Sequence, residues 1–123
     1  MLLDSNIIIY AAQPEHADLR VFTAEHIPAV SIVSLIEVLG FQRLQPSDRV
    51  LFEGFFSAAE ILPLSDAVVH EAIRLRQQRK MSLGDSIIAA TALHHRRTLV
   101  TRNTDDFRWI PHLVLLDPFA PST

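Results

Sequence analysis

The stretch SLGDSIIAATALHHRRTLVT, residues 82–101, decides the fold of this chain. Ser82 is a good helix cap, and apolar side chains follow it at helical spacing, at Leu83, Ile87, Ala90 and Leu93. The middle of the segment, IIAATAL, is apolar nearly all round, which predicts a helix at the centre of the molecule. Thr98–Thr101 is a short apolar run that predicts a buried strand directly after this helix.

The rest of the chain repeats this alternation of helices and strands. Short apolar runs predict further strands at Leu2–Leu3, Ala29–Ile32, Ile61–Leu64 and Leu113–Leu116. Helices are predicted from Ser34 to near Leu44, from Ser47 through Ala58 and from Asp66 onward, with shorter helical segments at Pro14–Phe22 and Thr104–Trp109. The stretch Ser5–Ala12 fits either a continuing strand or a helix. The alternation indicates an α/β fold with a mostly parallel sheet, and the length indicates one domain.

The composition is that of a folded globular protein, because 49% of the residues are hydrophobic and 20% are charged. No apolar run reaches the roughly 18 residues that a membrane helix needs. The start, MLLDSNIIIY, lacks the basic residues of a signal peptide. The chain has no cysteine, which excludes disulfides and thiolate metal sites. We therefore expect a cytoplasmic protein with no membrane partner.

The net charge of −3 argues weakly against a nucleic-acid partner. However, this total includes carboxylates that a metal ion would neutralise. Basic residues also cluster, in one group at Arg74, Arg76, Arg79 and Lys80 and in another at His94, His95, Arg96 and Arg97. A nearly neutral protein with local basic patches can still hold a phosphate backbone.

Acidic residues recur at one kind of position, after a predicted strand or early in a predicted helix. They are Asp4, Glu37, Asp85, Asp105 and Asp106, accompanied by Asn103. Glu37 and Asp85 are expected in the first turns of their helices. The carboxyl ends of parallel strands and the helix starts that follow them lie along one edge of a sheet. We therefore expect Asp4, Glu37 and the group Asn103–Asp106 to face a common crevice, which Asp85 can join.

A cluster of carboxylates at one edge suits a divalent cation. Mg²⁺ prefers oxygen ligands, binds through a few carboxylates and keeps several waters. The ion relieves the repulsion between the carboxylates, can generate a nucleophile from water, and can stabilise charge on a phosphodiester during in-line displacement. The pattern is therefore that of a metal site that can activate water and stabilise charge on phosphoryl oxygens.

Each acidic residue taken alone also has a structural explanation. Asp4 can cap a helix, and the spacings Ser34 to Glu37 and Ser82 to Asp85 both fit a capping box. Caps are common, so a single acid is more simply explained by capping. The set as a whole favours a site, because segments such as LLDSNIII place a carboxylate among residues expected to be buried, where an unpaired charge is costly.

Four segments, taken in order, resemble the PIN-domain family, and most closely its VapC-type toxins. They are Leu2–Ile7, Ser34–Glu37, Gly84–Ala92 and Leu99–Asn103 continued through Asp106–Phe107. The resemblance spans essentially the whole chain. It implies a three-layer PIN-like fold, with a short, mostly parallel central sheet flanked by helices, as a single nuclease domain over residues 1–123.

The resemblance further implies an endoribonuclease that depends on Mg²⁺ or Mn²⁺, commonly a homodimer and commonly inhibited by a cognate antitoxin. It carries Asp4, Glu37 and Asp85 over as acidic site residues. Many PIN domains have an aspartate where this chain has Asn103, which can ligate a metal through its oxygen but supplies no charge. Asp106 is near enough in the sequence to take that role, and the number of metal ions stays open.

The supporting residues implied by the same resemblance are Asn6 and Thr101, which would hold the carboxylates in place. Arg102, together with Arg96 and Arg97, is a candidate for guiding the RNA backbone, although such arginines also fit a solvated face.

Two alternatives to a nuclease remain at this stage. One is a catalytically degenerate PIN-like module that binds RNA or protein, which the asparagine at position 103 favours. The other is an aspartate-based phosphotransfer domain, which ranks low because no basic partner is well placed.

Overall fold

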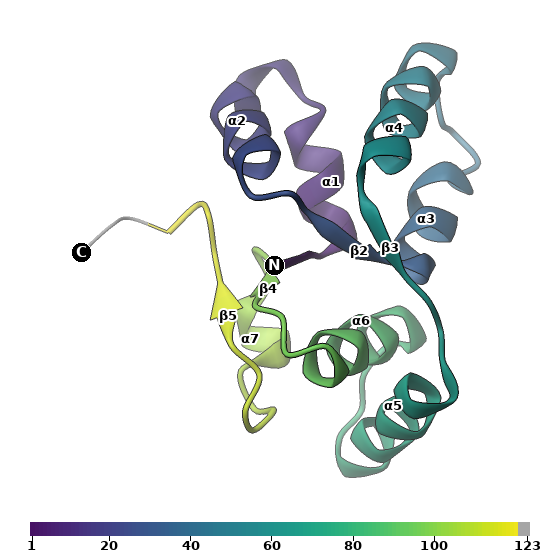
Figure 1. Ribbon diagram of the computed structural model, residues 1–123, viewed down its shortest axis with the longest axis vertical. Coiled ribbons are helices and arrows are strands. Elements are labelled where there is room, and N and C mark those ends of the chain that lie inside the picture. Colours follow the sequence, from purple (N-terminus) through teal and green to yellow (C-terminus); the bar gives the residue numbers. More distant parts are fainter. Residues whose placement is uncertain (121–123) are drawn as a thin grey trace.

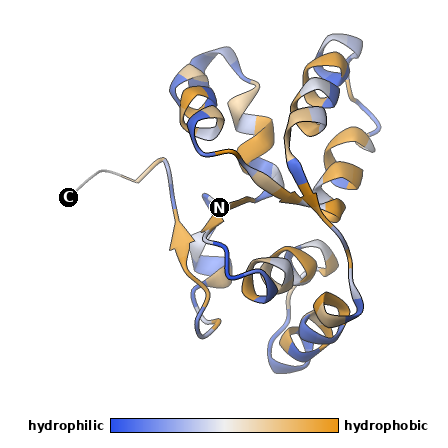
Figure 2. Ribbon diagram, in the orientation of Figure 1, coloured by the Kyte–Doolittle hydropathy of each residue, from blue (hydrophilic) through white to orange (hydrophobic). Residues whose placement is uncertain are grey.

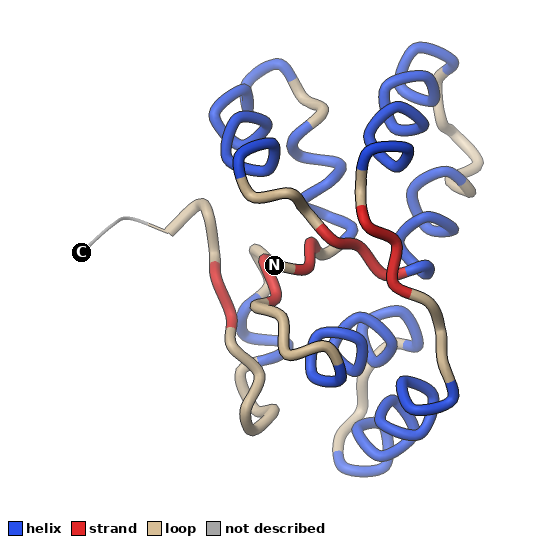
Figure 3. The backbone as a smooth tube through the Cα atoms, viewed as in Figure 1, coloured by secondary structure: helices blue, strands red, loops and turns tan. Residues whose placement is uncertain are grey.

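The computed structural model describes residues 1–120 of the chain, which form a sheet of five short parallel strands covered by helices on both faces (Figure 1). The strands are β1 Leu2–Leu3, β2 Ala29–Ser31, β3 Glu60–Leu62, β4 Leu99–Val100 and β5 Leu115–Leu116. Their order in the sheet is β3-β2-β1-β4-β5, and every pairing is parallel. Figure 3 shows the strands as a narrow central layer between helices. The predicted three-layer α/β architecture is therefore confirmed.

The helices divide between the two faces of the sheet. They are α1 Ser5–Ala11, α2 Ala17–Glu25, α3 Ile32–Leu39, α4 Pro46–Ala58, α5 Asp66–Gln78, α6 Leu83–His94 and α7 Thr104–Phe107, with a short 3-10 turn η1 at Pro14–His16. Helices α1 to α4 lie in the upper half of Figure 1, and α5, α6 and α7 lie in the lower half. None of the described helices is long and apolar enough to cross a membrane.

The strand residues alternate between two hydrophobic cores, as side chains of a pleated strand must. Leu2, Ala29 and Leu99 enter a core with α5 and α6. Their neighbours Leu3, Val30 and Val100 enter a second core with α1, α3 and α4. Figure 2 shows the strands as hydrophobic along the centre of the molecule. Two-sided burial explains why these strands read as continuous apolar runs rather than as an alternating pattern.

The central helix is α6, as the stretch 82–101 predicts. The Ser82 hydroxyl accepts a hydrogen bond from the Asp85 N–H at 3.1 Å, which caps the helix. Every residue from Ser86 to Ala92 is buried, because α5 packs against one side of the helix and the sheet lies over another.

Several predicted boundaries differ from the structure. Helix α3 begins at Ile32, where the Ser31 hydroxyl accepts from the Val33 N–H, so the capping-box interpretation of Ser34 is wrong. Glu37 accordingly lies in the second turn of α3 and not in the first. The open choice at Ser5–Ala12 resolves as helix α1, with Asp4 at its N-cap position.

Candidate active site at the carboxyl edge of the sheet

The carboxyl ends of β1, β2 and β4 gather polar residues at one edge of the sheet. Asp4 follows β1 directly, and its N–H donates to the Val100 carbonyl at 2.9 Å. Thr101 follows β4 in the same way, and its N–H donates to the Leu116 carbonyl at 3.0 Å. Backbone pairing between neighbouring strands therefore fixes Asp4 and Thr101 side by side.

Asp4 is a buried carboxylate that does not cap its helix. Only 4% of its surface is exposed, and its side chain makes no capping hydrogen bond to α1 although it stands at the N-cap position. Instead, the Thr101 hydroxyl donates to Oδ2 of Asp4 at 2.8 Å, and the same hydroxyl accepts from the Asn103 N–H at 3.0 Å. Thr101 therefore holds the Asp4 side chain at the edge of the sheet, and this side chain does not cap α1.

Glu37 of α3 lies at the same edge, where its carboxylate contacts Ser5 and lies close to Gly84. The Ser5 hydroxyl lies 2.9 Å from Oε1 of Glu37 and 2.9 Å from the hydroxyl of Ser34, so it links the starts of α1 and α3. A Cβ added at Gly84 would lie 3.0 Å from Oε2 of Glu37. The missing side chain therefore lets the Glu37 carboxylate approach the start of α6, next to Asp85.

The carboxylates at this edge act on one another through their charge. The pKa of Asp4 is raised from 3.8 to about 6, mainly by burial and also by the charges of Asp85 and Glu37, while the hydrogen bonds from Thr101 and the Ser5 backbone oppose the shift. Burial is also the main reason that the pKa of Asp85 is raised, and Asp106 and Glu37 add to it against the Ser82 hydrogen bond. No cation contributes to either shift in the described part of the chain. The edge therefore carries unbalanced negative charge.

The donor set suits a hard divalent cation, although the site is not a closed cage. Among residues 1–120, no three His, Asp or Glu side chains already converge as a group that could hold a metal. Asp4 and Asp85 offer oxygen ligands with unneutralised charge, which is the chemistry that Mg²⁺ selects. Because Mg²⁺ usually keeps several waters and takes one or two carboxylates, this arrangement fits the ion without further protein ligands.

The other predicted site residues differ in whether they contact the acidic edge. Asp106 lies in α7 and contributes to the raised pKa of Asp85, so it belongs to the same edge. Asn103 is exposed beside Thr101, and its side chain makes no hydrogen bond within residues 1–120. Asn6 is exposed in α1 and likewise shows no side-chain hydrogen bond in the described range. The structure thus gives Thr101, and not Asn6, the contact that a supporting residue needs.

The three arginines predicted for RNA binding do not lie together. Arg97 pairs with Glu60 at 2.6 Å, at the amino end of the strands and opposite the carboxylates. Arg96 precedes it in the turn after α6. Arg102 follows β4 at the carboxyl edge, where its guanidinium lies over the rings of Tyr10 and Phe119. Of these three arginines, only Arg102 is therefore at the same edge as the acidic cluster.

Sequence reasoning missed Ser5, Ser34 and Gly84. Ser5 and Ser34 are buried, with 7% and 0% exposure, and they join α1 to α3 beside Glu37. A serine inside an apolar segment is the available signal, because a buried hydroxyl needs a hydrogen-bond partner. Nothing local identifies the partner, since Ser5 and Glu37 are 32 residues apart.

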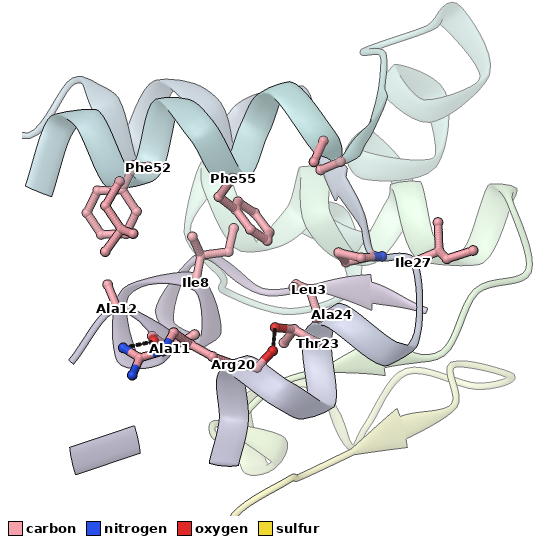
Figure 4. A pocket seen from close by; sticks show the side chains of 14 residues that line it. Leu3, Ile8, Ala11, Ala12, Arg20, Thr23, Ala24, Ile27, Phe52 and Phe55 are labelled. Carbon is pink, nitrogen blue, oxygen red and sulfur yellow. Dashed lines mark hydrogen bonds between the residues drawn. The ribbon is translucent and has the colours of Figure 1, made fainter. Parts of the chain in front are cut away.

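A separate feature is an apolar groove of about 480 Å³ between α1, α2 and α4 (Figure 4). Phe52 and Phe55 of α4 face Ile8 and the small residues at the end of α1 across this groove. Ile27 lies at its end and is 79% exposed. None of the carboxylates Asp4, Glu37 and Asp85 lines the groove, and most of its lining is hydrophobic, with the charged residue Arg20 on the α2 side.

Comparison with known proteins agrees with the architecture. A family model described as the PIN domain matches residues 1–113. Ribonuclease VapC2 of Rickettsia felis is 28% identical over 127 residues, which cover 93% of this chain and 94% of that protein.

Solved structures give the same result. A toxin-antitoxin complex from Klebsiella pneumoniae contains a chain 30% identical to this one, with a TM-score of 0.76 and coverage of 96% of this chain and 97% of that chain. DNA-bound VapBC from Salmonella typhimurium contains a chain 22% identical, with a TM-score of 0.82 and coverage of 94% and 96%, which shows a common fold.

The fold and the edge carboxylates together define a parallel α/β domain with an acidic site at the carboxyl ends of its strands. The chain belongs to the PIN-domain family.

Proposed function

We propose that this chain is a metal-dependent endoribonuclease, the toxin of a toxin–antitoxin pair, and that residues 1–123 act as a single nuclease domain. The observation that carries the proposal is Asp4, a buried carboxylate that shares its edge with Asp85 and Glu37 and whose raised pKa is offset by no cation among residues 1–120. A relative named Ribonuclease VapC2 aligns along almost the whole chain, which supports the choice of RNA as substrate.

Asp4 and Asp85, with Glu37 and Asn103 beside them, would hold Mg²⁺ or Mn²⁺. When bound, such an ion supplies Lewis-acid stabilisation of the phosphodiester and lowers the pKa of a nearby water. The chain itself contributes orientation: Thr101 fixes the Asp4 carboxylate, and Ser5 fixes Oε1 of Glu37.

Glu37 is also suited to accept a proton. It is exposed, and its Oε2 accepts no hydrogen bond from residues 1–120. We propose that this oxygen takes the proton that the attacking water gives up, while Asp106, exposed beside Asp85, supplies the negative charge that Asn103 lacks.

The partner in this proposal is an antitoxin protein. A solved relative that is 30% identical is described as a toxin-antitoxin complex. The apolar groove between α1, α2 and α4 is the surface that this chain offers to such a partner, because Ile27, Leu51 and Phe55 are left partly or fully uncovered there. A homodimer is part of the same proposal.

The test is cleavage of single-stranded RNA by the purified chain with Mg²⁺ and with EDTA. We expect cleavage with Mg²⁺, none in EDTA, and loss of cleavage in Asp85→Asn, while Asp18→Asn, an exposed aspartate on α2, behaves as wild type. Cleavage that persists in EDTA or in Asp85→Asn contradicts the metal role.

The second candidate function is a non-cutting PIN module, which Asn103 favours. RNA binding without cleavage, together with a melting temperature that Mg²⁺ does not raise, would establish that alternative.

A further inference from the structure

The arginines of this chain fall into groups according to what holds their guanidinium groups. Four of them form ion pairs with carboxylates: Arg49, Arg74, Arg97 and Arg108. Two others lie over aromatic rings instead. Arg79 lies 5.7 Å from the ring centroid of Trp109, and Arg102 lies 4.4 Å from that of Phe119 and 5.3 Å from that of Tyr10. Within residues 1–120, neither Arg79 nor Arg102 has a carboxylate at ion-pair distance.

Arg79 lies beside the acidic edge on the side of α5 and α6. It lines a cavity of about 530 Å³ together with Asp85, Asp106 and the neighbouring cation Lys80. Trp109 also lines this cavity, and its Nε1 donates to the Asp106 carbonyl at 3.0 Å. The ring that carries the Arg79 guanidinium is therefore fixed to the same element as Asp106.

Arg102 lies beside the acidic edge on the side of α1. It is the residue after Thr101, whose hydroxyl binds Asp4. The two rings beneath its guanidinium, Tyr10 and Phe119, meet edge to face at 5.5 Å. His16 packs edge to face on both of them, at 5.7 and 5.2 Å. Helices α1 and α5 lie on opposite faces of the sheet (Figure 1). Arg102 packs on Tyr10 of α1, whereas Arg79 follows α5 and shares a cavity with Asp85 and Asp106, so the two arginines approach the acidic edge from different faces.

An aromatic ring holds a guanidinium differently from a carboxylate. The ring attracts the cation through its face and does not use the N–H donors, which stay available in their planar fork for a phosphate. A carboxylate partner would occupy those donors and cancel the charge. An RNA strand that crosses the acidic edge has a phosphate on each side of the one that is cut, and positive charge on both sides of the edge would bind these two neighbours.

We propose that Arg79 and Arg102 form a two-sided clamp that binds the RNA phosphates flanking the phosphodiester that is cut, and that Trp109, Tyr10 and Phe119 are positioning residues for it. This inference rests on the proposed ribonuclease function. It adds Arg79 to the site and gives the aromatic residues around Arg102 a role in substrate binding.

The test measures RNA cleavage by wild type, Arg79→Gln and Arg102→Gln at several salt concentrations. Arg74→Gln is the matched control, because Arg74 has the same charge but pairs with Glu71 on the exposed surface of α5. We expect each clamp variant to raise KM about tenfold with kcat little changed, since a charge-assisted contact to phosphate is lost. In a plot of log(1/KM) against log[salt], the negative slope should become shallower by about 0.7 for each phosphate contact that is lost. Arg74→Gln should leave both quantities unchanged.

The positioning residues are tested by a double-mutant cycle. Phe119→Leu should raise KM by a few-fold in the wild-type background and have no further effect in the Arg102→Gln background, whereas Phe119→Tyr should retain wild-type KM. If Phe119 only stabilises the fold, the effect of Phe119→Leu should instead add to that of Arg102→Gln in the double variant, and kcat should fall.

Each outcome separates this inference from the proposed function. If wild type neither cuts nor binds RNA, the ribonuclease proposal fails and the clamp fails with it. If wild type cuts and both clamp variants behave as Arg74→Gln, only the clamp is wrong. Weakened binding of a partner protein with unchanged RNA kinetics would also overturn the clamp, because it would assign these arginines to the partner.

Discussion

At the amino edge of the sheet, where the strands begin, Arg97 and Glu60 form an ion pair at 2.6 Å, so opposite charges meet. At the carboxyl edge, the charges of Asp85 and Glu37 act on Asp4, and no cation of the described chain contributes to the raised pKa of Asp4 or of Asp85. Both edges belong to the same five strands, so the fold does not require this difference. Folding stability favours paired charges, whereas a cluster of like charges is retained where it serves a site. The contrast therefore supports the proposal that the chemistry takes place at the carboxyl edge.

The largest contrast between the edges is expected from Asp4→Asn. RNA cleavage should fall about 100-fold or more, because a negative ligand is lost at the edge that stabilises the reaction. The metal-free protein should nevertheless become more stable near neutral pH, by up to about 3 kcal/mol, because the buried charge is removed. Cleavage kinetics and urea unfolding in EDTA measure the two effects. A variant that loses activity and stability together would show that Asp4 is only structural.

The stability of the metal-free protein should fall as the pH rises from about 4 to about 6. The pKa of Asp4 is raised from 3.8 to about 6 in the folded chain, so across this window the folded state binds more protons than the unfolded state. Asp85, whose pKa is also raised, adds to the effect in the same direction. Urea unfolding at a series of pH values in EDTA checks this, and Mg²⁺ should restore stability at neutral pH. A free energy of unfolding that rises between pH 4 and pH 6 would contradict the claim that the charge of Asp4 is unbalanced in the folded protein.

A smaller effect is expected from Thr101→Val, which removes the hydroxyl that holds Asp4 and accepts the Asn103 N–H. Metal affinity or activity should drop about 10- to 100-fold, with partial recovery at high Mg²⁺, because the carboxylate is no longer oriented. Thr101→Ser keeps the hydroxyl and should stay close to wild type. Equal losses in both variants would indicate that packing of the methyl group, not the hydrogen bond, matters.

Gly84→Ala should produce a few-fold loss of activity. The new Cβ would lie 3.0 Å from Oε2 of Glu37, which is closer than a normal contact, so the carboxylate has to move. Stability should stay the same or rise by up to about 1 kcal/mol, because alanine favours the helix. Gly54→Ala is the matched control, since nothing lies within 4 Å of its added Cβ. Identical activities of the two variants would show that the space at Gly84 does not matter for the position of the Glu37 carboxylate.

The smallest effect is expected at the amino edge, from Glu60→Gln. The pair with Arg97 is partly exposed, so stability should change by less than about 1 kcal/mol and RNA cleavage should not change. Thermal unfolding and the cleavage assay measure both. A large loss of cleavage would indicate RNA contacts at the amino edge, and would contradict the claim that only the carboxyl edge serves the reaction.

The sequence predicts well what local pattern determines. The apolar run of α6 identifies a central helix, and the apolar pairs at Leu2–Leu3 and Leu99–Val100 identify buried strands, because burial on both faces leaves few polar positions. Asp4 stands out for the same reason, as a carboxylate in a segment that has to be buried.

The remaining features depend on contacts between distant parts of the chain. Both Ser31 and Ser34 are suitable helix caps, and only the end of β2 selects Ser31, which moves Glu37 into the second turn. The link from Ser5 to Glu37 spans 32 residues, and the two rings over which Arg102 lies belong to Tyr10 of α1 and to Phe119, which follows β5. Hydrogen bonds and ring contacts of this kind have no local signature in the sequence.

The central claim, that the carboxyl edge is built to hold a divalent cation, is tested most directly by anomalous diffraction from crystals soaked in Mn²⁺. We expect an anomalous peak within coordination distance of the Asp4 and Asp85 carboxylates, and its disappearance in Asp4→Asn. A map without a peak at this edge, or a peak that Asp4→Asn leaves unchanged, would contradict it.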